Sequence, residues 1–254
     1  MKNLYLILKA VFFAFAGNAQ RRYDARHRLL QSFAVRWGFR VYNRNLSWLK
    51  DSDYKQAWRL FPEADGTIHE RRFNLFNLAR SMRVVPGDIA ECGVFRGAGS
   101  YLMLSAQAGL GKQLFGFDSF EGLSEPSGLD RVETDYSFQW KKHDLSVGEA
   151  IAARNLACFG EQVTLLKGWI PERFSEVTGR RFSMVHIDVD LYEPTRDAAR
   201  FFYPLLSAGG MVVCDDYGFE SCPGAKRAMD EVAAEFGTCV VHLTTGQGLI
   251  LKVQ

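Results

Sequence analysis

From about residue 84 onward, short apolar runs rich in β-branched and aromatic residues alternate with longer segments of helical periodicity. This alternation predicts strands joined by helices, which is typical of a parallel α/β sheet. The predicted strands are Ile89–Val94, Gln113–Asp118, Val163–Gly168, Ser183–Val189, Gly210–Asp216, Thr238–Thr245 and Gly248–Val253. The predicted helices between them are Ser100–Ala108, Ser146–Cys158, Thr195–Leu206 and Pro223–Phe236.

The last two predicted strands are separated only by the residues around Gly246, a connection too short for a helical crossover. These two strands must therefore run antiparallel. Ahead of the sheet, residues 51–83 predict helices with polar interruptions, which we expect to cap the carboxyl edge of the sheet. The chain thus predicts a seven-stranded α/β domain at 84–254, a helical cap at 51–83 and a separate extension at 1–50.

The amino-terminal extension differs from the rest of the chain in charge. It holds ten Lys or Arg and one acid, Asp24, for a net charge of +9; residues 51–254 hold 21 basic and 28 acidic residues, for a net charge of −7. The extension begins with an apolar run, Leu4–Ala16, that only Lys9 interrupts. A run of about 13 residues is too short to span a bilayer, which needs about 20. The run therefore predicts an interfacial or buried helix.

A basic and aromatic stretch follows this apolar run. Its arginines and aromatic residues include Arg21, Arg22, Arg26, Arg28, Phe33, Arg36, Trp37, Phe39, Arg40, Tyr42 and Arg44. This composition suits an anionic membrane surface, but an oligomer or lid helix and a cleaved signal peptide are alternatives. Nucleic-acid binding is not predicted, because no recognised nucleic-acid-binding module is present.

The overall composition narrows the class of protein and its compartment. Hydrophobic residues at 47% and charged residues at 24% are ordinary globular values and exclude disordered and collagen-like classes. Five scattered cysteines form no Cys-x-x-Cys pair and are too sparse for a disulfide scaffold. We therefore expect a folded protein in a reducing compartment, the cytoplasm, either free or peripheral on the inner face of the membrane.

Glycines and acids gather where the predicted strands end. After Glu91 and Gly93 the chain runs through a glycine-rich loop into the helix at Ser100, an arrangement that suits a negatively charged ligand. The dinucleotide fingerprint Gly-x-Gly-x-x-Gly is absent, because Leu102 stands where its third glycine would fall. The second strand ends in Asp118, at the position where doubly wound folds bind ribose hydroxyls.

Four aspartates follow two strands that should be neighbours in the sheet, Asp188 and Asp190 after one and Asp215 and Asp216 after the other. Carboxylates brought this close together repel one another unless a cation neutralises them. Oxygen ligands without a cysteine or histidine set favour Mg²⁺, or Mn²⁺ or Ca²⁺, over zinc. The alternative is that one member of each pair only caps the following helix or turn.

Two further sets of polar residues have structural interpretations. His186 lies within an apolar strand and is interpreted as a core histidine. Arg71 and Arg72, ahead of the sheet, are interpreted as surface or interdomain pairing residues, with contact to substrate or cofactor as the alternative.

Several of these segments together resemble one enzyme family. They are Gly87–Gly97 with Ser100, Phe117–Leu123, Gly168-Trp169, His186–Thr195 and Asp215–Tyr217. In this order and combination, over about residues 70–252, they resemble the macrocin O-methyltransferase family. The resemblance implies a class I methyltransferase fold and an enzyme that uses S-adenosylmethionine and Mg²⁺ to methylate a hydroxyl of a sugar or glycosylated acceptor.

The resemblance also implies roles for individual residues. Glu91, Gly93 and Ser100 would line the methionine part of S-adenosylmethionine, and Asp118 and Ser119 would contact its ribose and adenine. The remaining implied cofactor-binding residues are Gly168, Trp169 and Asp188. The implied Mg²⁺ ligands are Asp188, Asp215 and Asp216.

The catalytic base is expected to be a carboxylate. Related metal-dependent methyltransferases place a lysine three residues beyond the strand-four aspartate, but Leu191 stands there in this chain. Asp188 and Asp190 are then the candidates for removing the proton from the acceptor hydroxyl. We expect a homo-oligomer acting on a small-molecule or glycan acceptor. The alternatives are a membrane-associated scaffold on an inactive methyltransferase fold and a nicotinamide-dependent sugar oxidoreductase.

Overall fold

The computed structural model describes residues 2–34, 48, 50–64, 68–133 and 138–253. The chain consists of two compact units, Met1–Lys50 and Asp51–Gln254. The basic and aromatic residues expected to act between positions 35 and 47 lie outside the described residues.

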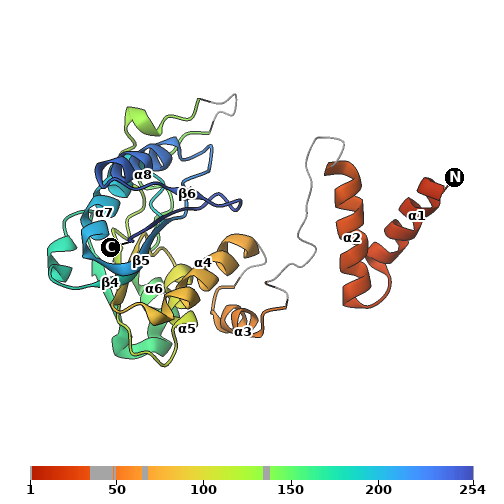
Figure 1. Cartoon of the computed structure of the whole chain (residues 1–254), viewed down its shortest axis with the longest axis horizontal. Coiled ribbons are helices and arrows are strands. Elements are labelled where there is room, and N and C mark those ends of the chain that lie inside the picture. Colours follow the sequence, from red (N-terminus) through yellow and green to blue (C-terminus); the bar gives the residue numbers. More distant parts are fainter. Residues whose placement is uncertain (1, 35–47, 49, 65–67, 134–137, 254) are drawn as a thin grey trace. The chain divides into compact units, whose positions relative to one another are not determined.

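The described residues of the second unit contain one seven-stranded sheet, labelled in Figure 1. Its strands are β1 (Asp88–Cys92), β2 (Leu114–Asp118), β3 (Val163–Lys167), β4 (Phe182–Ile187), β5 (Leu206–Cys214), β6 (Val241–His242) and β7 (Gly248–Leu251). Their order is β3-β2-β1-β4-β5-β7-β6. The first five strands in this order are parallel, whereas β7 pairs antiparallel with both β5 and β6. The predicted α/β sheet with an antiparallel carboxyl-terminal pair is therefore confirmed.

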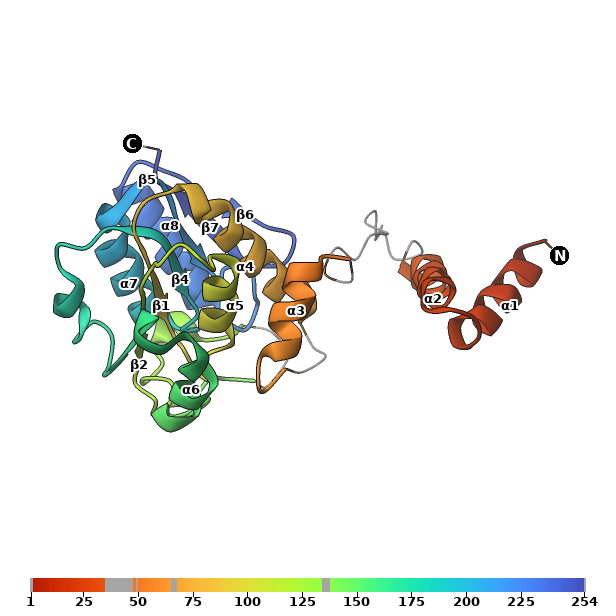
Figure 2. The ribbon, with the colours of Figure 1, turned by 90° about the horizontal axis from the view of Figure 1, so that it is seen from below.

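Helices cover both faces of this sheet. The helices of the described chain include α1 (Lys2–Phe15), α2 (Ala19–Ala34), α3 (Ser52–Leu60), α4 (His69–Ser81), α5 (Ala98–Ala106), α6 (Glu149–Leu156), α7 (Tyr192–Leu205) and α8 (Pro223–Glu235). Short 3₁₀ helices occupy Met82–Val84, Gly128–Asp130, Ala157–Gln162 and Phe174–Val177. Helices α7 and α8 pack together against β4 and β5, while α3 and α4 pack on α5 at the other face (Figure 2).

The central strands are buried on both sides, which explains their continuous apolar runs. All six residues of β4 are buried, and so are the last four of β1. The predicted eight-residue strand at 238–245 is wrong in extent, because only Val241 and His242 pair with β7. Strand β6 lies at the edge of the sheet, and both of its residues are exposed. It therefore has neither a second neighbouring strand nor a buried face that would stabilise a longer strand.

The order of the strands positions the functional site. The chain first builds outward from β1 to β3 and then returns to the other side of β1 with β4 and β5. Such a reversal opens a crevice beyond the carboxyl ends of the strands, where open α/β sheets bind their ligands. The crevice lies between β1 and β4.

The first unit is a helical hairpin. Helices α1 and α2 pack together through small residues, with Ala10, Ala14 and Ala25 buried. The turn between them contains Gly17 at φ +98°, a conformation that favours glycine. Among the described residues, no helix is both long and apolar enough to cross a membrane.

Candidate functional site

A cavity of about 390 Å³ lies at the carboxyl ends of the central strands. Its walls come from the loops after β1, β2, β3 and β4 and from the first turns of α7. The lining residues are Gly93, Phe95, Phe117, Asp118, Ser119, Gly122, Leu123, Ser124, Leu145, Trp169, Ile170, Pro171, Asp188, Val189, Asp190, Glu193, Pro194 and Asp197. The cavity thus unites six residues predicted from the sequence: Gly93, Asp118, Ser119, Trp169, Asp188 and Asp190. The predicted site residues Glu91, Ser100, Gly168, Asp215 and Asp216 do not line it.

Asp118 ends β2 with both carboxylate oxygens held by backbone donors. The N–H of Phe95 donates to Oδ2 at 2.8 Å, and the N–H of Phe120 donates to Oδ1 at 2.6 Å. Phe95 and Phe120 each adopt a left-handed backbone conformation, with φ values of 52° and 54°. Burial raises the pKa of Asp118, and these hydrogen bonds oppose the rise. The carboxylate is thus fixed at the cavity wall with acceptor capacity left for hydroxyl donors.

Glu91 on β1 takes part in a buried network. Its Oε2 accepts a hydrogen bond from the Ser100 hydroxyl, and its Oε1 pairs with His186 Nδ1 at 2.9 Å. A Cβ on Gly99 would overlap Glu91 Oε1, so the glycine lets the first turn of α5 approach the carboxylate. Likewise, a Cβ on Gly93 would overlap the carbonyl oxygen of Asp188. The glycines of this loop therefore permit close packing of β1, α5 and the end of β4.

His186 is buried, as a core histidine should be, but it also joins the two halves of the site. Its Nδ1 faces Glu91, and its Nε2 lies 3.5 Å from Asp215 Oδ1. Burial by itself lowers the pKa of His186, yet the interactions with Asp215 and Glu91 raise it to about 10. The two acids therefore favour the protonated form of the ring in the absence of a metal ion. The sequence signal was its position two residues before Asp188, which places both residues on one face of the strand.

Asp215 is the best-paired acid of the cluster. Arg71 of α4 forms an ion pair with its Oδ2, and Gln247 Nε2 donates to Oδ1 at 2.6 Å. Burial opposes ionisation, but His186 and Arg71 outweigh it and lower the pKa of Asp215. The Arg71 guanidinium also lies 3.7 Å from Asp216 and 4.4 Å from the centre of the Phe219 ring. Arg71, which the sequence suggested as a pairing residue, thus forms an ion pair with the acidic cluster. No sequence pattern pointed to Gln247.

The other three acids carry raised pKa values. Burial and the charge of Asp215 raise the pKa of Asp188 to about 7, and burial raises that of Asp190 to about 6. Asp216, buried beside the other carboxyls, has a pKa well above its usual value. The backbone N–H of Asp190 donates to Asp216 Oδ2 at 3.0 Å, and Asp190 itself has a left-handed φ of 60°. Burial and mutual repulsion therefore favour the protonated forms of these three acids.

The donor atoms of this cluster fit a divalent cation. Two groups have ligand atoms within 4.8 Å of one another: His186, Asp188 and Asp215 form the first, and Asp190, Asp216 and Cys222 form the second. The predicted set Asp188, Asp215 and Asp216 is thus divided between two adjacent groups. Oxygen donors predominate, which is the preference of Mg²⁺ and similar hard cations. Arg71 pairs with Asp215 and lies near Asp216, and His186 lies 3.5 Å from Asp215.

A protein-family model described as macrocin-O-methyltransferase (TylF) matches residues 20–236 of the chain. The 8-demethyl-8-(2,3-dimethoxy-alpha-L-rhamnosyl)-tetracenomycin-C 4'-O-methyltransferase of Streptomyces olivaceus is 35% identical over 149 residues, which cover 56% of this chain and 57% of that protein. The demethyldecarbamoylnovobiocin O-methyltransferase of Streptomyces niveus is 34% identical over 160 residues, covering 60% of each chain. The matches therefore span less than two thirds of the length of these curated relatives.

Solved structures agree with this relationship. The O-methyltransferase NovP is 28% identical and superimposes with a TM-score of 0.60, covering 73% of this chain and 80% of its own. The calicheamicin methyltransferase CalS11 has a TM-score of 0.61 at 18% identity, covering 79% and 93%, which shows the shared fold alone. The class I methyltransferase fold expected from the sequence is confirmed.

Proposed function

Because the chain belongs to the macrocin-O-methyltransferase (TylF) family, as its motifs predicted, we propose that it is an O-methyltransferase. The methyl donor is S-adenosylmethionine, and the acceptor is a hydroxyl of a sugar or glycosylated compound. One observation carries the proposal: a single cavity is lined by Asp118 on one side and by Asp188 and Asp190 on the other. A nucleoside-binding carboxylate and a proton-accepting carboxylate thus face the same space.

The β1–β2 side of the cavity is the proposed cofactor site. Asp118, already fixed by two backbone N–H groups, would accept the ribose hydroxyls, with Ser119 beside it. Gly93 lines the cavity without a side chain and so would let the methionine part approach the backbone. Glu91 and Ser100 do not line the cavity and would support the methionine end from behind Gly93; of Gly168 and Trp169, which follow β3, Trp169 would contact the cofactor.

The β4–β5 side is the proposed place of methyl transfer. The acceptor oxygen attacks the sulfonium methyl carbon, the carbon–sulfur bond breaks with its electron pair remaining on sulfur, and S-adenosylhomocysteine leaves. The proton of the hydroxyl passes to a carboxylate, either Asp188 or Asp190, whose raised pKa values suit a general base near neutral pH. Asp190 takes this role if Asp188 is a metal ligand.

Asp188, Asp215 and Asp216 would hold the divalent cation, Mg²⁺. A cation bound there lowers the pKa of a nearby hydroxyl and balances the charge of the cluster. In the present arrangement Arg71 already pairs with Asp215 and approaches Asp216. Arg71 therefore competes with a cation for these oxygens, and helix α4, which carries Arg71, is linked to occupancy of the metal site.

Calorimetric titration tests the cofactor assignment. We expect the protein to bind S-adenosylmethionine and S-adenosylhomocysteine but not NAD, and to transfer a labelled methyl group to a rhamnosyl glycoside only when MgCl₂ is present. Binding of NAD alone would instead support the sugar oxidoreductase, and binding of none of the three would support a scaffold on an inactive fold. The family match and the assembled acids favour neither alternative.

A cytoplasmic location and a homo-oligomeric state complete the proposal. S-adenosylmethionine is a cytoplasmic cofactor, and the free cysteines fit a reducing compartment. Light scattering of the purified chain measures the oligomeric state, and a monomeric mass would contradict the proposed homo-oligomer.

A further inference from the structure

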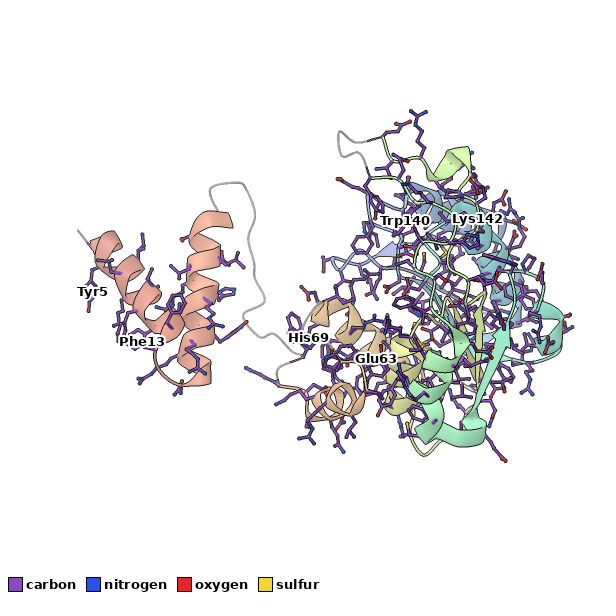
Figure 3. All side chains as sticks on the ribbon, turned by 180° about the vertical axis from the view of Figure 1, so that it is seen from behind. Tyr5, Phe13, Glu63, His69, Trp140 and Lys142 are labelled. Carbon is purple, nitrogen blue, oxygen red and sulfur yellow. The ribbon has the colours of Figure 1, made fainter. Side chains whose placement is uncertain are left out.

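Helix α1 exposes its largest apolar side chains. Tyr5, Leu8, Phe12 and Phe15 are 65%, 59%, 64% and 82% exposed. Their spacing of three or four residues places them in one stripe along the helix. Figure 3 shows Tyr5 pointing away from α2. The stripe is continued on both sides by Leu6, Ile7 and Val11, which are also exposed.

The side of α1 that contacts α2 carries mainly small residues, with Phe13 half-buried near the turn. Ala10 and Ala14 are buried there, and Arg26 of α2 donates to the carbonyl oxygen of Ala14 at 3.0 Å. A hairpin stabilised in water buries its large apolar residues and exposes the small ones. Small residues between helices and large ones facing outward are the arrangement of helices in lipid. The distribution of size around α1 therefore points to a nonpolar medium outside the hairpin.

Helix α2 supplies the complementary charge. Arg21, Arg26 and Arg28 are exposed on it, and Asp24 is its only acid. Lys9 lies beside the apolar stripe, with its Nζ 6.0 Å from the centre of the Tyr5 ring. Basic residues around an apolar helix face match a surface that is negative outside and apolar within, namely a bilayer with anionic headgroups.

The dimensions also fit this surface. A helix of 14 residues is about 21 Å long, shorter than the hydrocarbon core of about 30 Å, so α1 can lie in the interface but cannot cross it. Packed helices lie 8–10 Å apart, which places α2 among the headgroups when α1 lies at their lower boundary. Long arginine side chains on α2 then reach the phosphates.

We propose that the α1–α2 hairpin is a docking surface for bilayers that contain anionic lipid. Helix α1 inserts the stripe of Tyr5, Leu8, Phe12 and Phe15 into the interface, and the arginines of α2 bind the headgroups. The family match begins at residue 20, so α1 precedes the part of the chain shared with the methyltransferase family. The proposal does not depend on methyl transfer.

Flotation of the full chain with vesicles tests it. Phosphatidylcholine vesicles with one quarter phosphatidylglycerol should carry the protein upward at 50 mM NaCl, with at least fivefold less bound at 500 mM NaCl or on pure phosphatidylcholine. Phe12→Glu with Phe15→Glu should reduce binding at least tenfold. Val84→Glu with Val253→Glu removes equally exposed apolar residues from the second unit and should leave binding unchanged.

A charge variant separates the two components of binding. Arg21→Gln with Arg28→Gln should weaken binding about fivefold for each arginine removed and reduce its dependence on salt. Circular dichroism melting of each variant shows that the second unit remains folded. Failure of the wild-type chain to float at 50 mM NaCl overturns the proposal. If the same chain is an oligomer that Phe12→Glu with Phe15→Glu dissociates, the stripe is a subunit interface instead.

Discussion

The carboxylates at the two sides of the cavity differ in what neutralises them. On the β1–β2 side, Asp118 accepts two backbone N–H donors, and Glu91 accepts from Ser100 and His186. On the β4–β5 side, Asp188 and Asp190 are half-buried beside two further carboxyl groups, and their pKa values are raised. Carboxyl groups thus accept hydrogen bonds on one side of the cavity and lie close to one another on the other side.

This difference separates two kinds of recognition. A carboxylate that is already fixed and hydrogen-bonded can accept neutral hydroxyl donors without rearrangement. A cluster of closely spaced carboxyl groups favours a cation instead, since like charges disfavour joint ionisation. The position of Arg71 shows that helix α4 supplies one such cation from within the chain.

Replacing Asp215 and Asp216 together by Asn should give the largest effect. We expect Mg²⁺-dependent methyl transfer to fall at least about 100-fold, because metal catalysis contributes several kcal/mol. Binding of S-adenosylmethionine, measured by calorimetry, should remain. Asp230→Asn on α8 is the matched control, since its carboxylate pairs with Lys226 away from the cavity. Full wild-type activity in EDTA would refute the metal site.

Asp118→Ala tests the proposed ribose contact on the β1–β2 side of the cavity. Each charge-assisted hydrogen bond to the ribose that is lost costs about 1.5–3 kcal/mol, so the Kd for S-adenosylmethionine should rise at least about 10-fold. Asp88→Ala, at the amino end of β1, removes a carboxylate from the opposite edge of the sheet and should not change the Kd. An unchanged Kd in a folded Asp118→Ala protein would sink the ribose assignment.

Arg71→Ala should increase the affinity of the acidic cluster for a cation, the opposite of the effect of removing Asp215 and Asp216. Removing the guanidinium from Asp215 frees carboxylate oxygens, so affinity for Mg²⁺ should increase about three- to tenfold in calorimetry. Arg80→Ala on the same helix is the control, because Arg80 pairs with Asp51 at 2.9 Å. Weaker or unchanged Mg²⁺ binding by Arg71→Ala would contradict competition between Arg71 and the cation.

The smallest expected effect is on the thermal stability of the metal-free protein. Because the folded-state pKa of Asp188 is raised from 3.8 to about 7, folding favours its protonated form, and its contribution to stability falls as pH rises from about 4 to 7. In EDTA at pH 8, Asp188→Asn should therefore raise the melting temperature by about 5 °C, with little change at pH 4. A lower melting temperature than wild type at pH 8 would show that the charged carboxylate stabilises the fold.

Unlike Asp188, both His186 and Asp215 stabilise the folded state near neutral pH. The pKa of His186, raised to about 10, adds stability below about pH 6.5 that is lost only as pH approaches 10. The lowered pKa of Asp215 adds stability that is lost in acid. Because both residues interact with Asp188, Asp188→Asn also changes their contributions, and the measured shift belongs to the cluster as a whole.

The strand cores could be predicted because burial on both faces demands uninterrupted apolar runs. For the same reason the ends of β1, β2, β4 and β5 marked the edge where Asp118, Asp188 and Asp215 gather. The extent of β6 could not be predicted, because its length depends on the single neighbour β7 and not on its own composition. The conformation of Asp190, outside the strand with a positive φ, also has no sequence signal.

The residue types at the ends of the strands could be recognised from the sequence, because hydrophobic periodicity encodes burial and glycine encodes close approach. Which of these residues become partners depends on the tertiary fold. The order of strands places β1 beside β4, and this brings Glu91 to His186. Arg71 and Gln247 reach Asp215 across separations of 144 and 32 residues. Hydrophobic periodicity predicts that a side chain is buried. The tertiary fold determines which charged residue lies next to it.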